Sequence, residues 1–211
     1  QNQVLTKLEQ KQLISQPTSL VAYSSAKILV SDQAGNIWYF DGTVNQPQSL
    51  TLPTKLASGT KLIQKYLKNL YIFNSSDNQI YRVANFDKDL SSAAVATKTS
   101  LITNAPISDW SINGDIWTIN ATGTLLGLRR NAPVSHTALV PLSGPFHLAA
   151  IDKTVLISDG RIIAKLDPSS GSLAERLLLS DQTITDINQN GPLGWWIVID
   201  SKLYFLPTAQ L

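Results

Sequence analysis

The 211-residue chain contains neither cysteine nor methionine. Without cysteine it can form no disulfide bond and offers no thiolate ligand for a structural zinc ion, a composition that suits oxidising and reducing compartments alike. Methionine is missing at position 1 as well as in the interior. This favours a processed or excised piece of a longer protein, and we therefore expect the chain to be part of a larger product.

Charged residues are also scarce, at 15% of the chain against roughly 25% in average soluble domains. The 17 basic and 15 acidic side chains leave a net charge of +2, and the lysines are scattered, whereas nucleic-acid binding needs a concentrated basic face. No run approaches the roughly 20 apolar residues of a membrane-spanning helix, and the polar opening QNQ is unlike a signal peptide. We expect no nucleic-acid partner and no direct membrane insertion.

Helical periodicity is almost absent, apart from residues 4–13. Hydrophobic residues nevertheless make up 43% of the chain, which is too many for a disordered protein. Ser, Thr, Asn and Gln take the place of the missing charges, and such side chains suit exposed strand faces and turns. The composition therefore predicts an all-β fold with a sizeable core.

Five stretches of the chain share one pattern, in which an apolar strand ends in Asp or Asn and a tight turn leads into a second apolar strand. Turn sequences such as QAGN and SSDN are typical of antiparallel hairpins. Another short apolar segment stands before each hairpin and a further one follows it, which makes four strands in about 41 residues, the layout of a propeller blade. The acids or amides that end the strands are spaced by 42, 46, 39 and 41 residues: Asp32, Asn74, Asn120, Asp159 and Asp200.

The repeats predict a five-bladed β-propeller with four-stranded antiparallel blades. The last copy has no room for an outer strand, but QLISQPTSL (12–20) resembles LLLSDQTIT (177–185), which leads into that copy. Residues 11–16 are therefore expected to complete the last blade and close the ring, which removes an open sheet edge. Residues 1–10 are expected to be a leader or tether, and residues 11–211 a single domain. The expected blades are approximately residues 18–55, 56–100, 101–144, 145–182, and 183–211 together with 11–16.

Two blades resemble known propeller families. DGRIIAKLDPSSGSLAERLLL (159–179) resembles the pyrroloquinoline-quinone-type repeat, in which a strand ending in Leu-Asp precedes a Thr/Ser-Gly turn. ILVSDQAGNIWYFDG (28–42) is more similar to NHL-type repeats. The tryptophan docking motif of quinone-type enzymes is not regular here, and no Trp-Asp signature recurs as in WD40 blades. The resemblance implies a place at superfamily level among the diverse binding propellers, whose fold alone does not specify a function.

The recurrent Asp and Asn residues are interpreted as turn caps, because a short polar side chain at a strand end accepts hydrogen bonds from backbone N–H groups two residues on. The glycosylation sequons at Asn74 and Asn120 fall on these turn positions and are interpreted as coincidence. His136 and His147 have no partner at metal-ligand spacing. Glycine-rich phosphate motifs are missing too, so no metal and no cofactor is expected.

Asp109, Trp110 and Asp186 are the candidate binding residues. Asp109 and Asp186 lie in predicted inner strands, which face the channel of a propeller, and they form the one plausible carboxylate pair for glycoside hydrolysis. Trp110 follows an acid on such a strand and is expected to stack on a sugar or a peptide side chain. The other tryptophans are expected to fill the wedges between blades. Two acids without a Gly-x-Ser-x-Gly elbow do not define a reaction, so no catalytic residue is predicted.

The favoured function is a non-catalytic binding or scaffold module with a protein partner, forming the extracytoplasmic or cell-surface part of a larger bacterial protein. One alternative is a carbohydrate-binding, lectin-like propeller. Such a protein would carry matching loops in every blade, whereas QAGN, SSDN, ATGT and GR share little. The other alternative is a five-bladed, glycoside hydrolase-like enzyme that uses Asp109 and Asp186.

Overall fold

The computed structural model describes most of the chain, and nearly every regular element in that part is a β-strand, with one short 3-10 turn, η1 (Thr54–Leu56). The chain forms two compact units, residues 1–99 and 100–211. The described residues are 16–23, 27–41, 47–87, 89–96, 106–129, 132–133, 138–139, 142, 144–167, 172–179, 183–189, 194–199 and 202–207.

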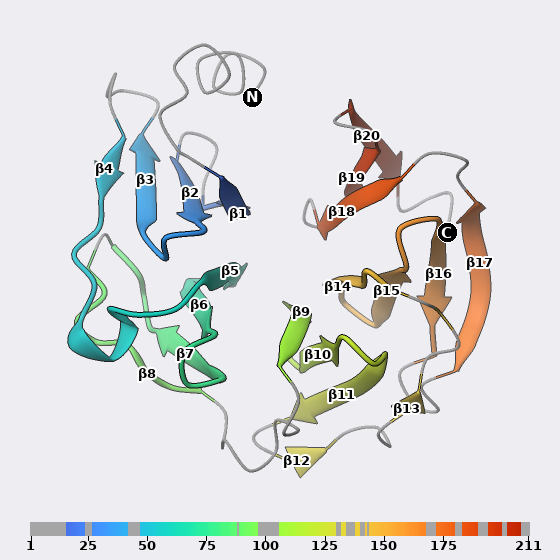
Figure 1. The fold of residues 1–211 in the computed structure, drawn as a ribbon, viewed down its shortest axis with the longest axis horizontal. Coiled ribbons are helices and arrows are strands. Elements are labelled where there is room, and N and C mark those ends of the chain that lie inside the picture. Colours follow the sequence, from blue (N-terminus) through green and yellow to red (C-terminus); the bar gives the residue numbers. More distant parts are fainter. Residues whose placement is uncertain are drawn as a thin grey trace. The chain divides into compact units, whose positions relative to one another are not determined.

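The first unit contains two antiparallel sheets, coloured blue to green in Figure 1. In both sheets each strand pairs with the next strand along the chain, so the strands form simple meanders. Sheet A consists of β1 (Pro17–Ala22), β2 (Lys27–Asp32), β3 (Ile37–Asp41) and β4 (Gln48–Ser49). Sheet B consists of β5 (Lys61–Tyr66), β6 (Asn69–Asn74), β7 (Gln79–Val83) and β8 (Ala94–Val95).

The second unit contains three antiparallel sheets. Sheet C consists of β9 (Ile107–Ile112), β10 (Ile116–Asn120) and β11 (Thr124–Arg129), with the short strands β12 (Ala132–Pro133) and β13 (Ala138–Leu139) both paired to β11. Sheet D consists of β14 (His147–Ile151), β15 (Thr154–Ser158), β16 (Ile162–Leu166) and β17 (Leu173–Leu179). Sheet E consists, in the described residues, of β18 (Ile184–Gln189), β19 (Gly194–Ile199) and β20 (Lys202–Pro207).

All five hairpins predicted from the repeat are present, as β2–β3, β6–β7, β10–β11, β15–β16 and β19–β20. Each is preceded by the expected first strand, and these strands, β1, β5, β9, β14 and β18, are called the inner strands below. The segment expected to complete the last blade, residues 11–16, lies outside the described residues except for Gln16, whose carbonyl accepts a hydrogen bond from Gln33 N–H at 3.0 Å. The expected leader, residues 1–10, also lies outside them.

The core of each unit lies between its sheets. In the first unit, buried residues of sheets A and B, among them Leu29, Ile37, Ile63 and Leu70, form one cluster. In the second unit, one cluster includes Trp117 and Ile157 of sheets C and D. A separate cluster joins sheet D to sheet E. Because sheet D is covered on both faces, β15 is apolar at successive positions, with Val155, Leu156 and Ile157 all fully buried.

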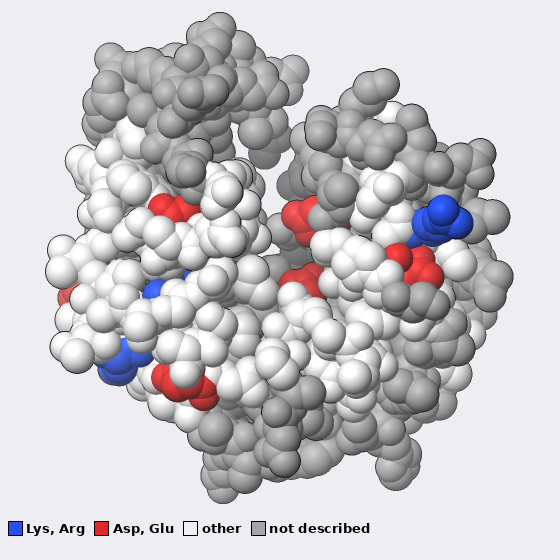
Figure 2. Space-filling model, viewed as in Figure 1, with Lys and Arg blue, Asp and Glu red and all other residues white. Residues whose placement is uncertain are grey.

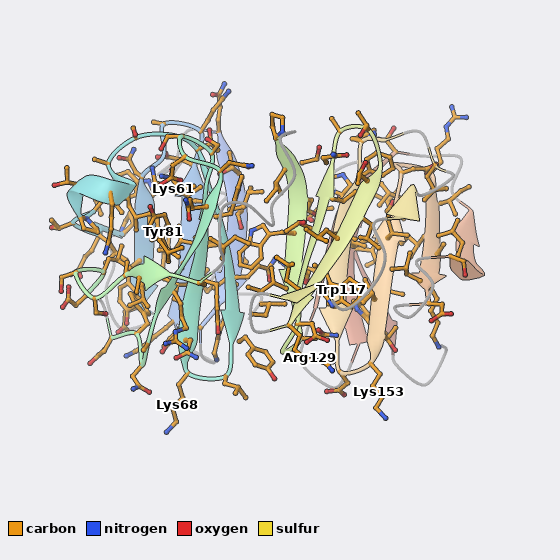
Figure 3. The ribbon with its side chains drawn as sticks, turned by 90° about the horizontal axis from the view of Figure 1, so that it is seen from below. Lys61, Lys68, Tyr81, Trp117, Arg129 and Lys153 are labelled. Carbon is orange, nitrogen blue, oxygen red and sulfur yellow. The ribbon has the colours of Figure 1, made fainter. Side chains whose placement is uncertain are left out.

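Within each unit the inner strands are neighbours. β1 lies against β5 in the first unit, and β14 lies against both β9 and β18 in the second. Figure 3 shows Trp117 among the side chains between strands, whereas Lys153, in the β14–β15 turn, points away from them. In the part of the chain that the structure describes, no helix is long and apolar enough to span a membrane.

Candidate functional site

The polar residues that end the hairpin strands cap their turns. The Asp32 carboxylate accepts a hydrogen bond from Asn36 N–H at 2.9 Å. Asn120 Oδ1 accepts from Thr122 N–H at 3.0 Å and Thr124 N–H at 2.9 Å. Asp159 Oδ1 accepts from Arg161 N–H and Ile162 N–H at 3.1 and 2.9 Å. These bonds confirm the interpretation as turn caps at three of the five repeats.

Asn74 departs from this pattern. Its Nδ2 donates to Lys55 O at 3.3 Å and to Ser76 Oγ at 2.8 Å, while its buried Oδ1 accepts no hydrogen bond. Asn74 and Asn120 are 0% and 5% exposed, so neither sequon presents its amide to solvent. The fifth turn residue, Asp200, lies outside the described residues.

Titratable side chains occur on the inner strands at one equivalent position of the repeat. It is the inner-strand residue that pairs with the residue just before the turn acid or amide, and we call it the bridging position. Among its five occupants only an aspartate and a histidine are titratable, and both belong to the second unit. The occupants, in chain order, are Ser19, Leu62, Asp109, His147 and Ile184.

Side chains at and near the bridging position join β9 to β14 in the second unit and β1 to β5 in the first. Asp109 Oδ2 accepts a hydrogen bond from Leu148 N–H at 2.7 Å, and Ser111 Oγ accepts one from Ala150 N–H at 2.9 Å. In the first unit, the Ser19 hydroxyl accepts from Ile63 N–H and donates to Ile63 O, both at 3.1 Å. An edge strand has unpaired backbone groups, and these side chains satisfy some of them.

Asp109 and Asp186 interact electrostatically. Burial is the main cause that raises the pKa of the half-buried Asp109 to about 8, and the negative charge of Asp186 raises it further, against the opposing effect of the Leu148 and Trp110 N–H groups. Burial raises the pKa of Asp186 to about 6, although solvent still reaches its side chain. Protein atoms around Asp186 therefore displace enough water to disfavour its charge while leaving part of its surface accessible.

His147 shares this surface. It is half-buried on β14, the strand between β9 and β18, and burial lowers its pKa below the ordinary value. Near neutral pH, Asp109 therefore carries a proton, Asp186 is ionised and His147 is neutral. Figure 2 shows acidic atoms exposed over the inner strands of the second unit. Among the described residues, no group of three or more His, Cys, Asp or Glu side chains could hold a metal ion.

The expected role of Trp110 in stacking is wrong for this conformation, because the Trp110 side chain is 0% exposed. Side chains alternate along a strand, so Trp110 lies on the face of β9 opposite to Asp109, where other residues cover it. Trp117 is buried as expected, and its Nε1 donates to Asn113 Oδ1 at 3.1 Å. The binding roles of Asp109 and Asp186 stay predictions.

The sequence analysis missed His147 as a member of this site. The segments PISDWSI (106–112) and PFHLAAI (145–151) align by their prolines, and that alignment places His147 beside Ser108. A β-bulge in β9 adds one residue, since Ile107 pairs with Asn120 and Asp109 with the preceding Ile119. The extra residue shifts Asp109 to the position that His147 occupies in β14. A second bulge, between Ile184 and Asp186, changes the register of β18.

No family model matches the chain, and no curated protein sequence does either. The fold is similar to the solved structure described as YCF48 bound to D1 peptide, with a TM-score of 0.59 and 10% identity over 92% of this chain and 65% of that one. It is also similar to a structural genomics protein of unknown function from Bacteroides thetaiotaomicron, with a TM-score of 0.58 and 9% identity over 87% of this chain and 66% of that one. The chain thus spans about two-thirds of the length of these structures. At such low identity the likeness shows the fold alone.

Proposed function

We propose that the chain is a β-propeller module that binds a peptide segment of another protein. One structure with a similar fold is that of YCF48 bound to D1 peptide, which supports a propeller of this kind as a protein-binding module. We also propose that the module lies outside the cytoplasm as part of a larger bacterial protein. This part of the proposal is supported by composition alone. Fractionation of the source cells, with an antibody against the chain, would test that location.

The proposed binding surface is formed by β9, β14 and β18. The observation that carries it is the occupant of the bridging position, because Ser19 joins two inner strands in the first unit with an uncharged hydroxyl. Holding the strands together therefore does not require a carboxylate. Burial and the charge of Asp186 disfavour the ionised form of the half-buried Asp109, and groups with such perturbed pKa values concentrate at functional sites. Near neutral pH the ionised Asp186 would attract a segment that carries Lys or Arg, and Asp109 would add to the attraction at higher pH.

A peptide-display selection on the purified chain at neutral pH tests this function. We expect enriched peptides that bind the wild type and lose affinity in the Asp186→Asn variant. The matched control is Asp152→Asn, which removes one charge from an exposed turn of sheet D; Asp152 has φ +48°, a conformation that Asn tolerates well. A selection that enriches no binding peptide would overturn the proposed function.

The proposed architecture is a closed ring of five blades in which residues 11–16 supply a strand beside β20. It is supported by the three described strands of sheet E, where sheets A, B and D have four, and by the likeness of residues 12–20 to 177–185. Ile14→Pro would remove a backbone donor from such a strand and should destabilise the protein. Leu5→Pro, in the expected leader, is the matched control. Equal unfolding curves for the two variants would contradict this closure.

Glycoside hydrolysis is the second candidate, because the two carboxyl groups differ in protonation state near pH 7 as an acid and its partner must. The geometry of Asp109 opposes it: Oδ1 accepts from Trp110 N–H at 2.8 Å and Oδ2 from Leu148 N–H at 2.7 Å, so both oxygens are turned to the backbone. Assays on chromogenic glycosides with the wild type and an Asp109→Asn/Asp186→Asn variant separate the two candidates. Hydrolysis lost only in that variant would favour the enzyme, and a glycan array would test sugar binding alone.

A further inference from the structure

The three inner strands of the second unit bring titratable groups together on one surface. Asp109 on β9 is held in place by two backbone N–H groups, of Trp110 and Leu148. β14, which packs against β9, carries His147, and β18 beyond it carries Asp186. β10 on the other side of β9 (Ile116–Asn120) contains no titratable residue. Burial and Asp186 raise the pKa of Asp109, and the Leu148 and Trp110 N–H groups oppose that shift.

We propose that protons on Asp109 and Asp186 regulate the protein-binding surface of β9, β14 and β18, so that a segment carrying Lys or Arg binds weakly in acid and tightly in alkali. This regulation rests on the proposed function, and it adds the chemistry of the partner and the condition for its release. Ser19, the counterpart of Asp109 in the first unit, is uncharged and gives no such control.

The surface changes its charge in two steps. Below about pH 5 both carboxyl groups carry protons and the pair is neutral. Asp186 ionises first, as the pH passes about 6, and Asp109 follows as it passes about 8. Burial lowers the pKa of His147, so its compensating positive charge is weaker than that of an ordinary histidine. Lys and Arg side chains of a partner stay charged throughout, so each step should strengthen the attraction.

Fluorescence anisotropy with a labelled oligolysine peptide, compared with an oligoglutamine peptide of equal length, tests the regulation at low salt. We expect the affinity for oligolysine to rise roughly five- to tenfold at each step, an amount typical of one added charge pair near a protein surface. Asp186→Asn should abolish the lower step and Asp109→Asn the upper one, whereas Asp152→Asn should retain both. A flat profile in the wild type, or two unchanged steps in the double variant, would overturn the proposal.

A second measurement separates this proposal from the proposed function. The peptides enriched in the display selection are measured over the same pH range. If they bind equally well in acid and alkali, the regulation is wrong and protein binding stands. If the selection enriches none, protein binding is wrong whatever oligolysine does. Two affinity steps for enriched peptides that carry Lys or Arg, each lost in the matching variant, would support the regulation.

Discussion

The junction of β1 with β5 and that of β9 with β14 solve one structural problem with different chemistry. In the first unit, the Ser19 hydroxyl both accepts from and donates to the backbone of Ile63. In the second, the Asp109 carboxyl accepts from Leu148 N–H. A hydroxyl bridges strands equally at any pH, whereas a carboxyl also titrates. The difference shows that the acid supplies a property beyond strand pairing, which is why Asp109 stands out as a functional candidate.

The first unit also buries a charged residue. Lys61 is 0% exposed, and its Nζ donates to Ser58 O at 3.0 Å and to Gly59 O at 2.5 Å. Figure 3 shows Lys61 within the body of this unit, while Lys68 points away from it. Burial lowers the pKa of Lys61, against the opposing effect of the negative charges of Asp32 and Asp77, and the two carbonyl oxygens stabilise the ammonium group. Burial of an ionisable group is therefore not enough to indicate function, even where acidic side chains act on its pKa.

The largest effect should come from Gly35 in the turn next to Lys61. Gly35 has φ +86°, and a Cβ there would lie 2.3 Å from Gly59 O and 2.8 Å from Lys61 Nζ. We expect Gly35→Ala to lower the free energy of unfolding by about 3–4 kcal/mol, through backbone strain together with the clash.

Gly160, in the second unit, is the matched position. It has a similar φ of +89°, but a Cβ there would meet Pro145 at 3.5 Å, an ordinary contact. Gly160→Ala should therefore cost only the backbone strain, about 1–2 kcal/mol. Urea denaturation of both variants measures the difference. Equal losses would mean that the turns of the two units are packed alike.

The next effect is a fall in the free energy of unfolding as the pH rises, caused by Asp109 in the second unit. Asp109 has a pKa raised to about 8 from 3.8, so the folded state holds its proton where the unfolded state has lost it. Its contribution is thus favourable in acid and is lost as the pH rises from about 4 to about 8, by an amount on the order of a few kcal/mol.

Asp109→Ser, which copies the first unit, should remove most of this pH dependence. The Ser19→Ala variant should retain it, because Ser19 does not titrate. Urea denaturation at about pH 5 and about pH 8 gives the comparison. A slope in Asp109→Ser as steep as in the wild type would show that other groups cause the fall.

The hairpins could be predicted because the repeat combines two independent signals, alternating apolar residues and a polar turn cap. Asp32, Asn120 and Asp159 all cap their turns as expected. The two-residue outer strands β4 and β8 were expected as longer segments, but so few backbone pairs leave little periodicity to detect. The burial of Trp110 was not predictable from alternation, which separates the two faces of a strand without showing which of them is covered.

The candidate site was predicted only in part. Asp109 and Asp186 were found because their places on inner strands follow from the repeat alone. His147 was missed because the bulge in β9 adds one residue before Asp109, and a bulge has no reliable signature in a single sequence. The strand pairing shows that the two residues are equivalent, because His147 pairs with Ser158 and Asp109 with Ile119, each just before the turn acid or amide.

A smaller effect should distinguish the two hydroxyl bridges. Ser111→Ala leaves the Ala150 N–H without its acceptor, and Ser19→Ala does the same to the Ile63 N–H. Each substitution should cost about 1–2 kcal/mol, the typical penalty of an unsatisfied buried donor. Amide hydrogen exchange should accelerate at Ala150 alone in the first variant and at Ile63 alone in the second. Faster exchange at both amides in either variant would mean that the two junctions open together.

The smallest effect is expected at the exposed ion pair of sheet C. Arg129 Nη2 lies 2.6 Å from Asp115 Oδ2, and the Arg129 side chain is 66% exposed. Water screens such a pair and ordering its long side chain opposes the attraction, so Arg129→Ala should change the free energy of unfolding by no more than about 0.5 kcal/mol. Urea denaturation at low and high salt measures it. A loss as large as that in Ser111→Ala would mean that a short distance to an opposite charge stabilises this fold even at an exposed site. We expect instead that an ionisable group matters to this fold through its burial and the groups beside it.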